Sequence, residues 1–327
     1  MGWTQDFTTR ASEGDLTVGV IGLGYVGLPT AIGFHDAGFE VWGVDISQRT
    51  VDMIKRGENP TGDPDVDDLI PRPGSERWNI TTSTSDAVPH CDVVLVTVPT
   101  PVTEDLKPNL TYVQSAGRAV FESVKRGMKT IVVLESTVYP GVTAQTWLPE
   151  LEELNLKIGE DVEIAYCPER FNPGDPAHGV RQVARVIGCS NPEVGAGLVG
   201  LYSRLTTEDV RYVGKLEVAE AAKVIENVQR DINIALVNEL ARIFPELDVD
   251  VEDVLSEALF LLRKASLKYF ETDRSFNFTA YAITFIRESI KEYKSKWNGL
   301  SGSDRNELIH TAIRIIKNKN YKSGEKL

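Results

Sequence analysis

Long apolar runs are absent from this sequence of 327 residues, and no stretch approaches the roughly 20 residues that a membrane-spanning helix needs. Residues 1–14 are polar and acidic and lack the apolar segment of a secretion signal. Cysteine is also scarce, with only three residues. Cys91, Cys167 and Cys189 have neither metal-ligand spacing nor the pattern of a disulfide framework. These absences predict a cytoplasmic chain with a loose tail at residues 1–14, no metal site, and cysteines that serve as small buried residues.

Lysine is scarce in one part of the chain only, and the balance of charge changes at the same place. Residues 1–257 contain 21 basic and 41 acidic residues, a net charge of −20, with 7 of the 16 lysines. Residues 258–327 contain 14 basic and 7 acidic residues, a net charge of +7, and the two sums give −13. An acidic, lysine-poor surface favours solubility in high salt. This break predicts two segments of different origin.

The most informative motif begins after an apolar run at residues 16–21. There Gly22, Gly24 and Gly27 have the G-x-G-x-x-G spacing of a dinucleotide-binding turn, and an amphipathic run follows at residues 29–37. Gly22 permits a tight turn, Gly24 lets the backbone approach a pyrophosphate, and Gly27 lets the helix pack on its strand. The alternative is a glycine turn that binds no cofactor.

A second apolar run, residues 39–44, ends in Asp45, about twenty residues after the glycines. An acidic side chain at this point of a dinucleotide-binding unit binds the ribose 2′-hydroxyl of NAD and disfavours the 2′-phosphate of NADP. The sequence therefore predicts NAD as the cofactor.

Strand and helix patterns alternate over the first two thirds of the chain. Residues 92–98 and 130–134 are continuous apolar runs, which are typical of parallel strands covered on both faces. Helical patterns follow at residues 112–126 and 143–153. We therefore expect an α/β fold with a Rossmann-type doubly wound parallel sheet over residues 15–212.

A long central helix is predicted over residues 213–247, followed by a small all-α segment at residues 248–327. The apolar stripe of the helix is broad, which predicts packing on both sides and a contact through which two copies form a homodimer. Lys223 and Asn227 lie four residues apart and therefore on one face. An exposed lysine is the alternative interpretation of Lys223, whereas an amide within an apolar helix needs partners.

Residues 15–257 resemble the nucleotide-sugar 6-dehydrogenase family, which includes UDP-glucose and GDP-mannose dehydrogenases. The resemblance is carried by GVIGLGYVGLP, VTVPTP, ESTVYPGVT, YCPERFNPG, RVIG and KLEVAEAAKVIENVQRDINIALVNELA. The forms VYPG and PERFNPG resemble the branch that acts on UDP-N-acetylhexosamines. The family oxidises C6 of a nucleotide sugar to a carboxylate with NAD, for polysaccharide biosynthesis, so the resemblance implies a UDP-sugar as substrate.

Four catalytic residues follow from the resemblance. Lys223 and Asn227 would hold the oxygen at C6 and the water beside it, with the lysine opposing the charge of a developing alkoxide. Thr137 and Glu169 would position and activate the water that hydrolyses a thioester.

The same resemblance implies a cofactor site that extends beyond one turn. Besides the three glycines and Asp45, its expected residues are Tyr25, Val26, Pro99, Thr100, Ser136 and Thr137. The alternative interpretation of Glu169 is an ordinary loop ion pair with Arg170 or Arg185.

One part of the family's chemistry is missing from the sequence. The family places a nucleophilic cysteine in a Gly-Gly-His-Cys loop, but no such loop occurs here and no cysteine follows Cys189. The resemblance also implies a second Rossmann-like domain that grips the nucleotide, and we expect this chain to lack it. A thiol is required because the aldehyde must become a covalent hemithioacetal before a second hydride can leave. We therefore expect NAD binding without completed oxidation.

Residues 250–327 resemble region 2 of bacterial sigma factors. The match is carried by DVEDVLSEAL and by FETDRSFNFTAYAITFIR, which is similar to that family's DPxRGxFSTYA turn and WIR helix, although Ser275 replaces the turn glycine. The resemblance implies contact with RNA polymerase or single-stranded DNA. The stacking and basic residues would be Tyr281, Phe285, Arg287, Lys291, Lys294 and Lys296. The alternative is that these aromatic residues pack a helical core.

Three hypotheses follow. The preferred one is a chimera, joined within residues 248–257, of a dehydrogenase-like front truncated before its thiol and a sigma-like helical piece. The second is a working NAD-dependent UDP-sugar dehydrogenase with a divergent C-terminal half and another nucleophile. The third is a transcription-initiation or DNA-binding module.

Overall fold

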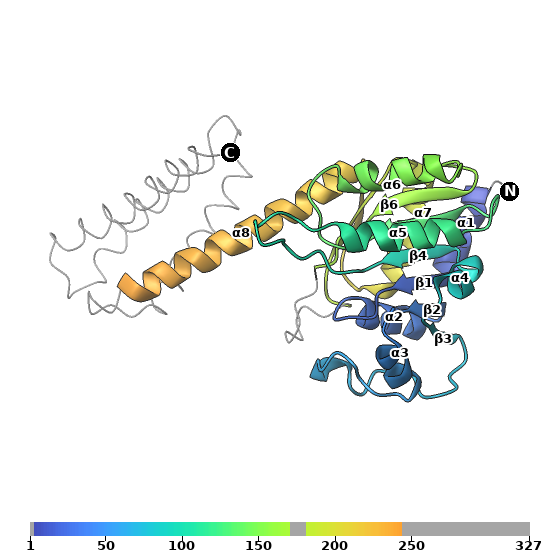
Figure 1. Cartoon of the computed structure of the whole chain (residues 1–327), viewed down its shortest axis with the longest axis horizontal. Coiled ribbons are helices and arrows are strands. Elements are labelled where there is room, and N and C mark those ends of the chain that lie inside the picture. The colour runs from blue at the N-terminus through green and yellow to red at the C-terminus, as the bar shows by residue number, and fades with distance from the viewer. Residues whose placement is uncertain (1–2, 171–180, 244–327) are drawn as a thin grey trace. The chain divides into compact units, whose positions relative to one another are not determined.

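The computed structural model describes residues 3–170 and 181–243. Within these residues the strands form one eight-stranded sheet of order β3-β2-β1-β4-β5-β6-β7-β8 (Figure 1). The chain reverses direction across the sheet between β1 and β4, so the predicted doubly wound Rossmann-type sheet is confirmed. The strands are β1 Thr17–Ile21, β2 Glu40–Val44, β3 Trp78–Thr81, β4 Val93–Val96, β5 Thr130–Leu134, β6 Val162–Tyr166, β7 Arg185–Cys189 and β8 Val210–Gly214.

Helices connect the strands, and polar side chains cap the N-termini of two of them. Ser47 accepts a hydrogen bond from the Thr50 N–H and so caps α3, and Asn191 caps α7 in the same way through the N–H groups of Glu193 and Val194. The helices are α1 Trp3–Glu13, α2 Gly27–Asp36, α3 Gln48–Lys55, α4 Thr84–Ala87, α5 Thr111–Ser123, α6 Val142–Glu153, α7 Pro192–Leu205 and α8 Leu216–Ile243, with short 3-10 turns at Pro64–Val66 and Val88–His90.

Two apolar clusters cover the two faces of the sheet. One joins α1, α2, α3 and α7 to the inner strands, with Phe34 and Tyr202 among its fully buried side chains. The other joins α5, α6 and the start of α8 to the opposite face around Trp147. Because both faces are covered, strands such as β4 and β5 are buried at every position, which explains their continuous apolar runs.

The sheet is parallel except at one place. Strand β7 runs antiparallel to β6, with Ala165 opposite Cys189 and Tyr166 opposite Gly188. The first residue of β7, Arg185, therefore lies at the edge where β6 ends, instead of the opposite edge. The strand patterns predicted a mostly parallel sheet but did not indicate which strand is reversed.

The prediction of a loose tail at residues 1–14 is wrong, because most of this stretch forms helix α1. Phe7 and Ala11 are buried against α7, where a side chain on Gly197 would collide with the Phe7 ring. Arg10 donates two hydrogen bonds to the Asp92 carboxylate at 2.8 and 3.0 Å and so ties α1 to the start of β4. The polar composition misled the prediction, since two apolar residues one turn apart suffice to dock a short helix.

The chain divides into two compact units, Met1–Arg230 and Asp231–Leu327. The first unit ends within α8, whereas the sequence analysis placed boundaries at residues 212 and 247. The predicted sigma-like segment, residues 248–327, lies outside the described residues, as does the predicted join at residues 248–257. Among the described helices, none is long and apolar enough to cross a membrane.

Replacing Phe7 with alanine tests the docking of α1. The variant Phe7→Ala removes a ring that is 3% exposed and should lower the free energy of unfolding by about 3 kcal/mol in urea denaturation. The control Ser12→Ala changes an exposed residue of the same helix and should alter stability by less than about 0.5 kcal/mol. Equal stability of the two variants would show that α1 is not docked and would support the prediction of a loose tail.

Candidate functional site

The glycine turn between β1 and α2 is held by close backbone contacts. Gly22 has a positive φ of 95° and donates its N–H to the Val44 carbonyl, so it needs the conformational freedom of glycine. A Cβ on Gly27 would lie 1.8 Å from the Gly22 carbonyl oxygen. Thr97 donates its hydroxyl to the same oxygen at 2.8 Å and links the turn to the end of β4.

Gly24 lies in the same turn in a different environment. A Cβ built on Gly24 would meet no atom within 4 Å, and the neighbouring Tyr25 is exposed. The protein itself therefore does not require glycine at this position. An open approach to the backbone at the N-terminus of α2 is what a bound pyrophosphate would use, so these residues fit a dinucleotide.

Asp45 follows β2 directly and faces the glycine turn. Its carboxylate accepts one hydrogen bond from the Leu23 N–H at 2.9 Å and another from the Ser47 N–H at 2.9 Å. These bonds fix the direction of the carboxylate, and each oxygen keeps a further lone pair for a ribose hydroxyl. The structure thus brings together the glycines and the acid that the sequence analysis selected.

Val26 lies at the N-cap of α2, and four other predicted cofactor residues lie where β4 and β5 end. Ser136 is buried and donates its hydroxyl to the Val98 carbonyl at 2.6 Å. Thr100 donates to the carbonyl of Thr137 at 2.9 Å, which connects the two loops. Pro99 and Thr137 are exposed at this edge, so their side chains face the open side of the site.

Lys223 and Glu169 meet beside the same edge. Lys223, on α8, is only 6% exposed and donates its ammonium to the backbone carbonyl of Glu169, so the interpretation as an exposed lysine is wrong. Burial lowers the pKa of Lys223, and the nearby Glu169 carboxylate opposes that effect. Asn227 is half-buried one turn further along α8.

Glu169 has the properties of a buried base. Burial raises the pKa of its carboxyl to about 7, while the charges of Arg185 and Lys223 oppose the rise. The alternative of a direct loop ion pair is not found among the described residues, where Arg170 pairs with Glu226 at 2.6 Å and Arg185 pairs with Glu135 at 3.6 Å, although the charge of Arg185 still acts on Glu169. A carboxyl with a pKa near neutrality suits proton transfer.

Three residues outside the predicted site support this arrangement, and of these only Arg185 was named from the sequence, as a possible ion-pair partner of Glu169. Glu135 and Arg185 are fully buried, and Tyr202 donates its hydroxyl to Glu135 at 2.6 Å. The available signal was a charged residue next to an apolar strand, since Arg185 begins one such strand and Glu135 directly follows another. Buried charged residues are rare unless they are paired, so Glu135 and Arg185 each indicate that a buried partner exists, but the sequence does not identify that partner.

A fourth residue outside the predicted site, Glu220, joins α8 to α6. Its buried carboxylate accepts hydrogen bonds from the Gly141 N–H at 2.5 Å, the Thr143 N–H at 3.0 Å and the Thr143 hydroxyl at 2.6 Å. Gly141 has no side chain to cap α6, so a residue from another helix satisfies the free N–H groups. Glu220 therefore fixes the loop that carries Ser136 and Thr137 relative to the helix that carries Lys223.

All three cysteines of the chain are buried, as the sequence analysis predicted. Burial raises the pKa of the Cys167 thiol to about 12 and that of Cys189 to about 11, and it also raises the pKa of Cys91. These thiols are therefore protonated at neutral pH and are poor nucleophiles.

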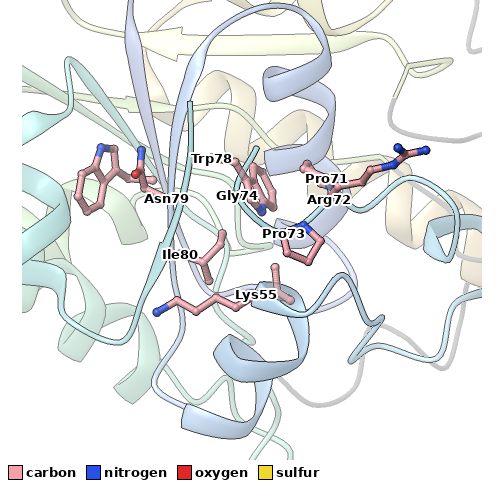
Figure 2. Close-up of a pocket in the computed structure, with 10 residues that line it drawn as sticks. Lys55, Pro71, Arg72, Pro73, Gly74, Trp78, Asn79 and Ile80 are labelled. Carbon is pink, nitrogen blue, oxygen red and sulfur yellow. The ribbon is translucent and has the colours of Figure 1, made fainter. Parts of the chain in front are cut away.

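A cavity of about 350 Å³ lies elsewhere, at the outer strand β3. Figure 2 shows Trp78 beside Gly74, with Lys55 of α3 and Arg72 of the preceding loop pointing in different directions. Its described lining residues include none of the predicted site residues, and its two cations do not converge on one point. The cavity therefore does not belong to the site at the ends of β1, β4, β5 and β6.

The chain matches the NAD binding domain of the UDP-glucose/GDP-mannose dehydrogenase family over residues 16–206. It matches the central domain of the same family over residues 217–273, which reaches past the predicted join at residues 248–257.

Individual relatives agree with the family match. The UDP-N-acetyl-D-glucosamine 6-dehydrogenase of Pseudomonas aeruginosa is 42% identical over 245 residues, which are 75% of this chain and 56% of that protein. The UDP-N-acetyl-D-mannosamine dehydrogenase of Escherichia coli (strain K12) is 39% identical over 246 residues, covering 73% and 57%. The chain thus spans a little more than half the length of these curated relatives.

Solved structures show the same likeness. A UDP-D-ManNAc dehydrogenase from Pyrococcus horikoshii has a TM-score of 0.68 and 31% identity, covering 75% of this chain and 58% of that one. A ternary complex of GDP-mannose dehydrogenase from Pseudomonas aeruginosa has a TM-score of 0.68 and 27% identity, covering 74% and 56%.

A pair of glycine variants separates folding from cofactor binding. Gly27→Ala should lower the free energy of unfolding by several kcal/mol, because the new methyl group collides with the Gly22 carbonyl. Gly24→Ala should leave stability within about 0.5 kcal/mol, because its methyl group enters open space, yet weaken NAD⁺ binding at least about tenfold. Urea denaturation and calorimetric titration measure the two effects, and normal NAD⁺ affinity in Gly24→Ala would exclude this turn as the pyrophosphate site.

Proposed function

The chain belongs to the UDP-glucose/GDP-mannose dehydrogenase family, and from that premise we propose that it is an NAD-dependent UDP-N-acetylhexosamine dehydrogenase-like protein whose own residues do not complete the oxidation. The observation that carries the proposal is one sheet edge along which the contact of the glycine turn with Asp45 and the contact of Lys223 with Glu169 both lie, while all three cysteines are buried. The relatives named for UDP-N-acetylhexosamines support that class of substrate.

NAD is the cofactor of this family's first domain, which residues 16–206 form. Bound there, it supplies an acceptor for the hydride that leaves a sugar C6. The turn from Gly22 to Gly27 would hold the pyrophosphate through free N–H groups, and Asp45 would accept the ribose hydroxyl. The loops at Pro99, Thr100 and Ser136 would border the nicotinamide end.

Lys223 and Asn227 would act on the alcohol. The Lys223 ammonium is already oriented by the Glu169 carbonyl, and in a water-poor site its charge stabilises an alkoxide strongly. Asn227 lies one helical turn away on the same face and would donate to the same oxygen. Together they account for one oxidation, from alcohol to aldehyde.

Glu169 and Thr137 would serve the later hydrolytic step. A base with a pKa of about 7 can accept a proton from water, and the exposed Thr137 would hold that water. The step between these two, attack of a thiolate on the aldehyde, has no candidate among the three buried cysteines. This gap supports the proposal of incomplete oxidation.

Further partners remain proposals as well. Exposed Val218, Ile225 and Val228 on the first part of α8 support a homodimer formed through this helix. For residues 248–327, of which residues 248–273 match the central domain of the dehydrogenase family, the sequence pattern alone supports a sigma-like contact with RNA polymerase or single-stranded DNA. Salt-dependent binding of an oligonucleotide by the full chain would support that contact, and its absence would leave helix packing as the explanation.

NAD⁺ should raise the melting temperature of the full chain, because a ligand that binds only the folded state stabilises it by mass action. At one hundred times the dissociation constant the gain is about 2.7 kcal/mol, equivalent to roughly 5–10 °C for a domain of this size. NADP⁺ at equal concentration should give a much smaller shift, because Asp45 repels the 2′-phosphate. If NAD⁺ at millimolar concentration leaves the melting temperature unchanged in a thermal scan, the proposal fails.

UDP-N-acetylglucosamine or UDP-N-acetylmannosamine with NAD⁺ should give no sustained formation of NADH, followed by its absorbance. A small burst of at most one NADH per sugar is compatible with oxidation to the aldehyde. Formation of two NADH molecules per sugar would show that a nucleophile is present after all. Lys223→Met provides the control, because it should abolish any burst while leaving the NAD⁺ melting shift intact.

A further inference from the structure

Arg185 is fully buried and begins β7 at the sheet edge where β6 ends and Glu169, the residue that would act as the base, follows. Because β7 is antiparallel to β6, the first residue of β7 reaches the edge where residues 167–169 follow β6. Its guanidinium forms an ion pair with Glu135 at 3.6 Å and lies over the Tyr202 ring, 5.6 Å from the centroid. Arginine keeps its charge even when buried, so a fixed positive charge stands in this part of the core.

The charges around Glu169 come from three elements. Arg185 on β7 and Lys223 on α8 favour the ionised carboxylate, and of the two the effect of Arg185 is larger. Glu135, after β5, opposes ionisation. Tyr202 on α7 donates its hydroxyl to Glu135 and so faces the ion pair of Arg185 and Glu135 rather than Glu169.

We propose that Arg185 is a positioning residue for Glu169: anchored by Glu135 and the Tyr202 ring, its guanidinium is the fixed counter-charge that lets a buried Glu169 carboxylate ionise and accept a proton from water. The proposal rests on the proposed function, because it assigns a supporting residue to the base of the hydrolytic step. Within the described residues the guanidinium donates no hydrogen bond, so its effect on Glu169 is exerted through charge.

Arg185 thereby acquires a role beyond packing. A neutral side chain of similar size would fill the same space but would leave Glu169 with Lys223 as its main counter-charge. In a poorly hydrated site the loss of one opposite charge disfavours the carboxylate, so the base would stay protonated at neutral pH. A purely structural Arg185 would leave the titration of Glu169 unchanged.

The experiment follows the titration of Glu169 directly in the full chain. Glutamate labelled with ¹³C at Cδ gives one carboxyl signal per residue by NMR, and Glu169→Gln identifies the signal of Glu169 by its disappearance. Removing Arg185 alone leaves Glu135 as an unpaired buried charge, which is strongly destabilising. The main variant is therefore the double substitution Arg185→Met with Glu135→Gln, which removes both charges.

The expected results have opposite signs. Arg185→Met with Glu135→Gln should raise the titration midpoint of Glu169 by about one pH unit, because the attraction of Arg185 exceeds the repulsion of Glu135. Glu135→Gln alone should lower the midpoint, because only repulsion is lost. Tyr202→Phe, a control that keeps the ring beneath Arg185 and changes no charge, should leave it within about half a unit.

An unchanged midpoint in the folded double variant, or a rise in Glu135→Gln, would overturn the proposal. Folding is checked by the NAD⁺ melting shift, which depends on the glycine turn and not on Arg185. That shift also separates the two proposals: its loss in the unmodified chain contradicts NAD binding, whereas the titration still tests Arg185.

Discussion

Burial of charged side chains is the constraint on which the carboxyl edge of this sheet depends. Glu135, Arg185, Glu169, Glu220 and Lys223 are all buried, although they come from distant parts of the sequence. Removing one partner of a buried charge pair costs about 3–5 kcal/mol, so each group needs its counterpart in place. Arg185 offsets Glu135, the N–H groups at the start of α6 satisfy Glu220, and a backbone carbonyl accepts from Lys223. These contacts fix β7, the start of α6 and the first part of α8 relative to one another around the site.

Features governed by neighbours in sequence could be predicted well. The turn from Gly22 to Gly27 depends on steric limits that glycine spacing expresses directly, and Asp45 follows from the length of one β-α-β unit. The buried strands were recognisable because both faces of the sheet are covered. Lys223 and Asn227 share a face because helical period is a local property.

Features that depend on distant partners could not be predicted in the same way. A short apolar run such as β7 carries no information on its direction, and the antiparallel pairing with β6 decides where Arg185 lies. The docking of α1 depends on Gly197 of α7, whose small size has no meaning until the two helices meet. Likewise, Glu135 required a buried partner, but nothing local identified Arg185 and Tyr202 as its partners.

The proposed chemistry of the site divides into steps for which the chain offers candidate residues and one step for which it offers none. A hydride can leave an alcohol when a positive charge stabilises the oxygen, and water can be activated by a carboxylate near its pKa. In the proposed function, Lys223 and Glu169 would provide these two conditions. The step between them needs a thiolate, and burial favours the neutral thiol in each of the three cysteines. A base held beside a fixed counter-charge is useful only if a thioester forms, so in the proposed function Glu169 and Arg185 would serve the second half of the reaction. The three cysteines of this sequence offer no reactive thiolate for the covalent step that would join the proposed oxidation to the proposed hydrolysis.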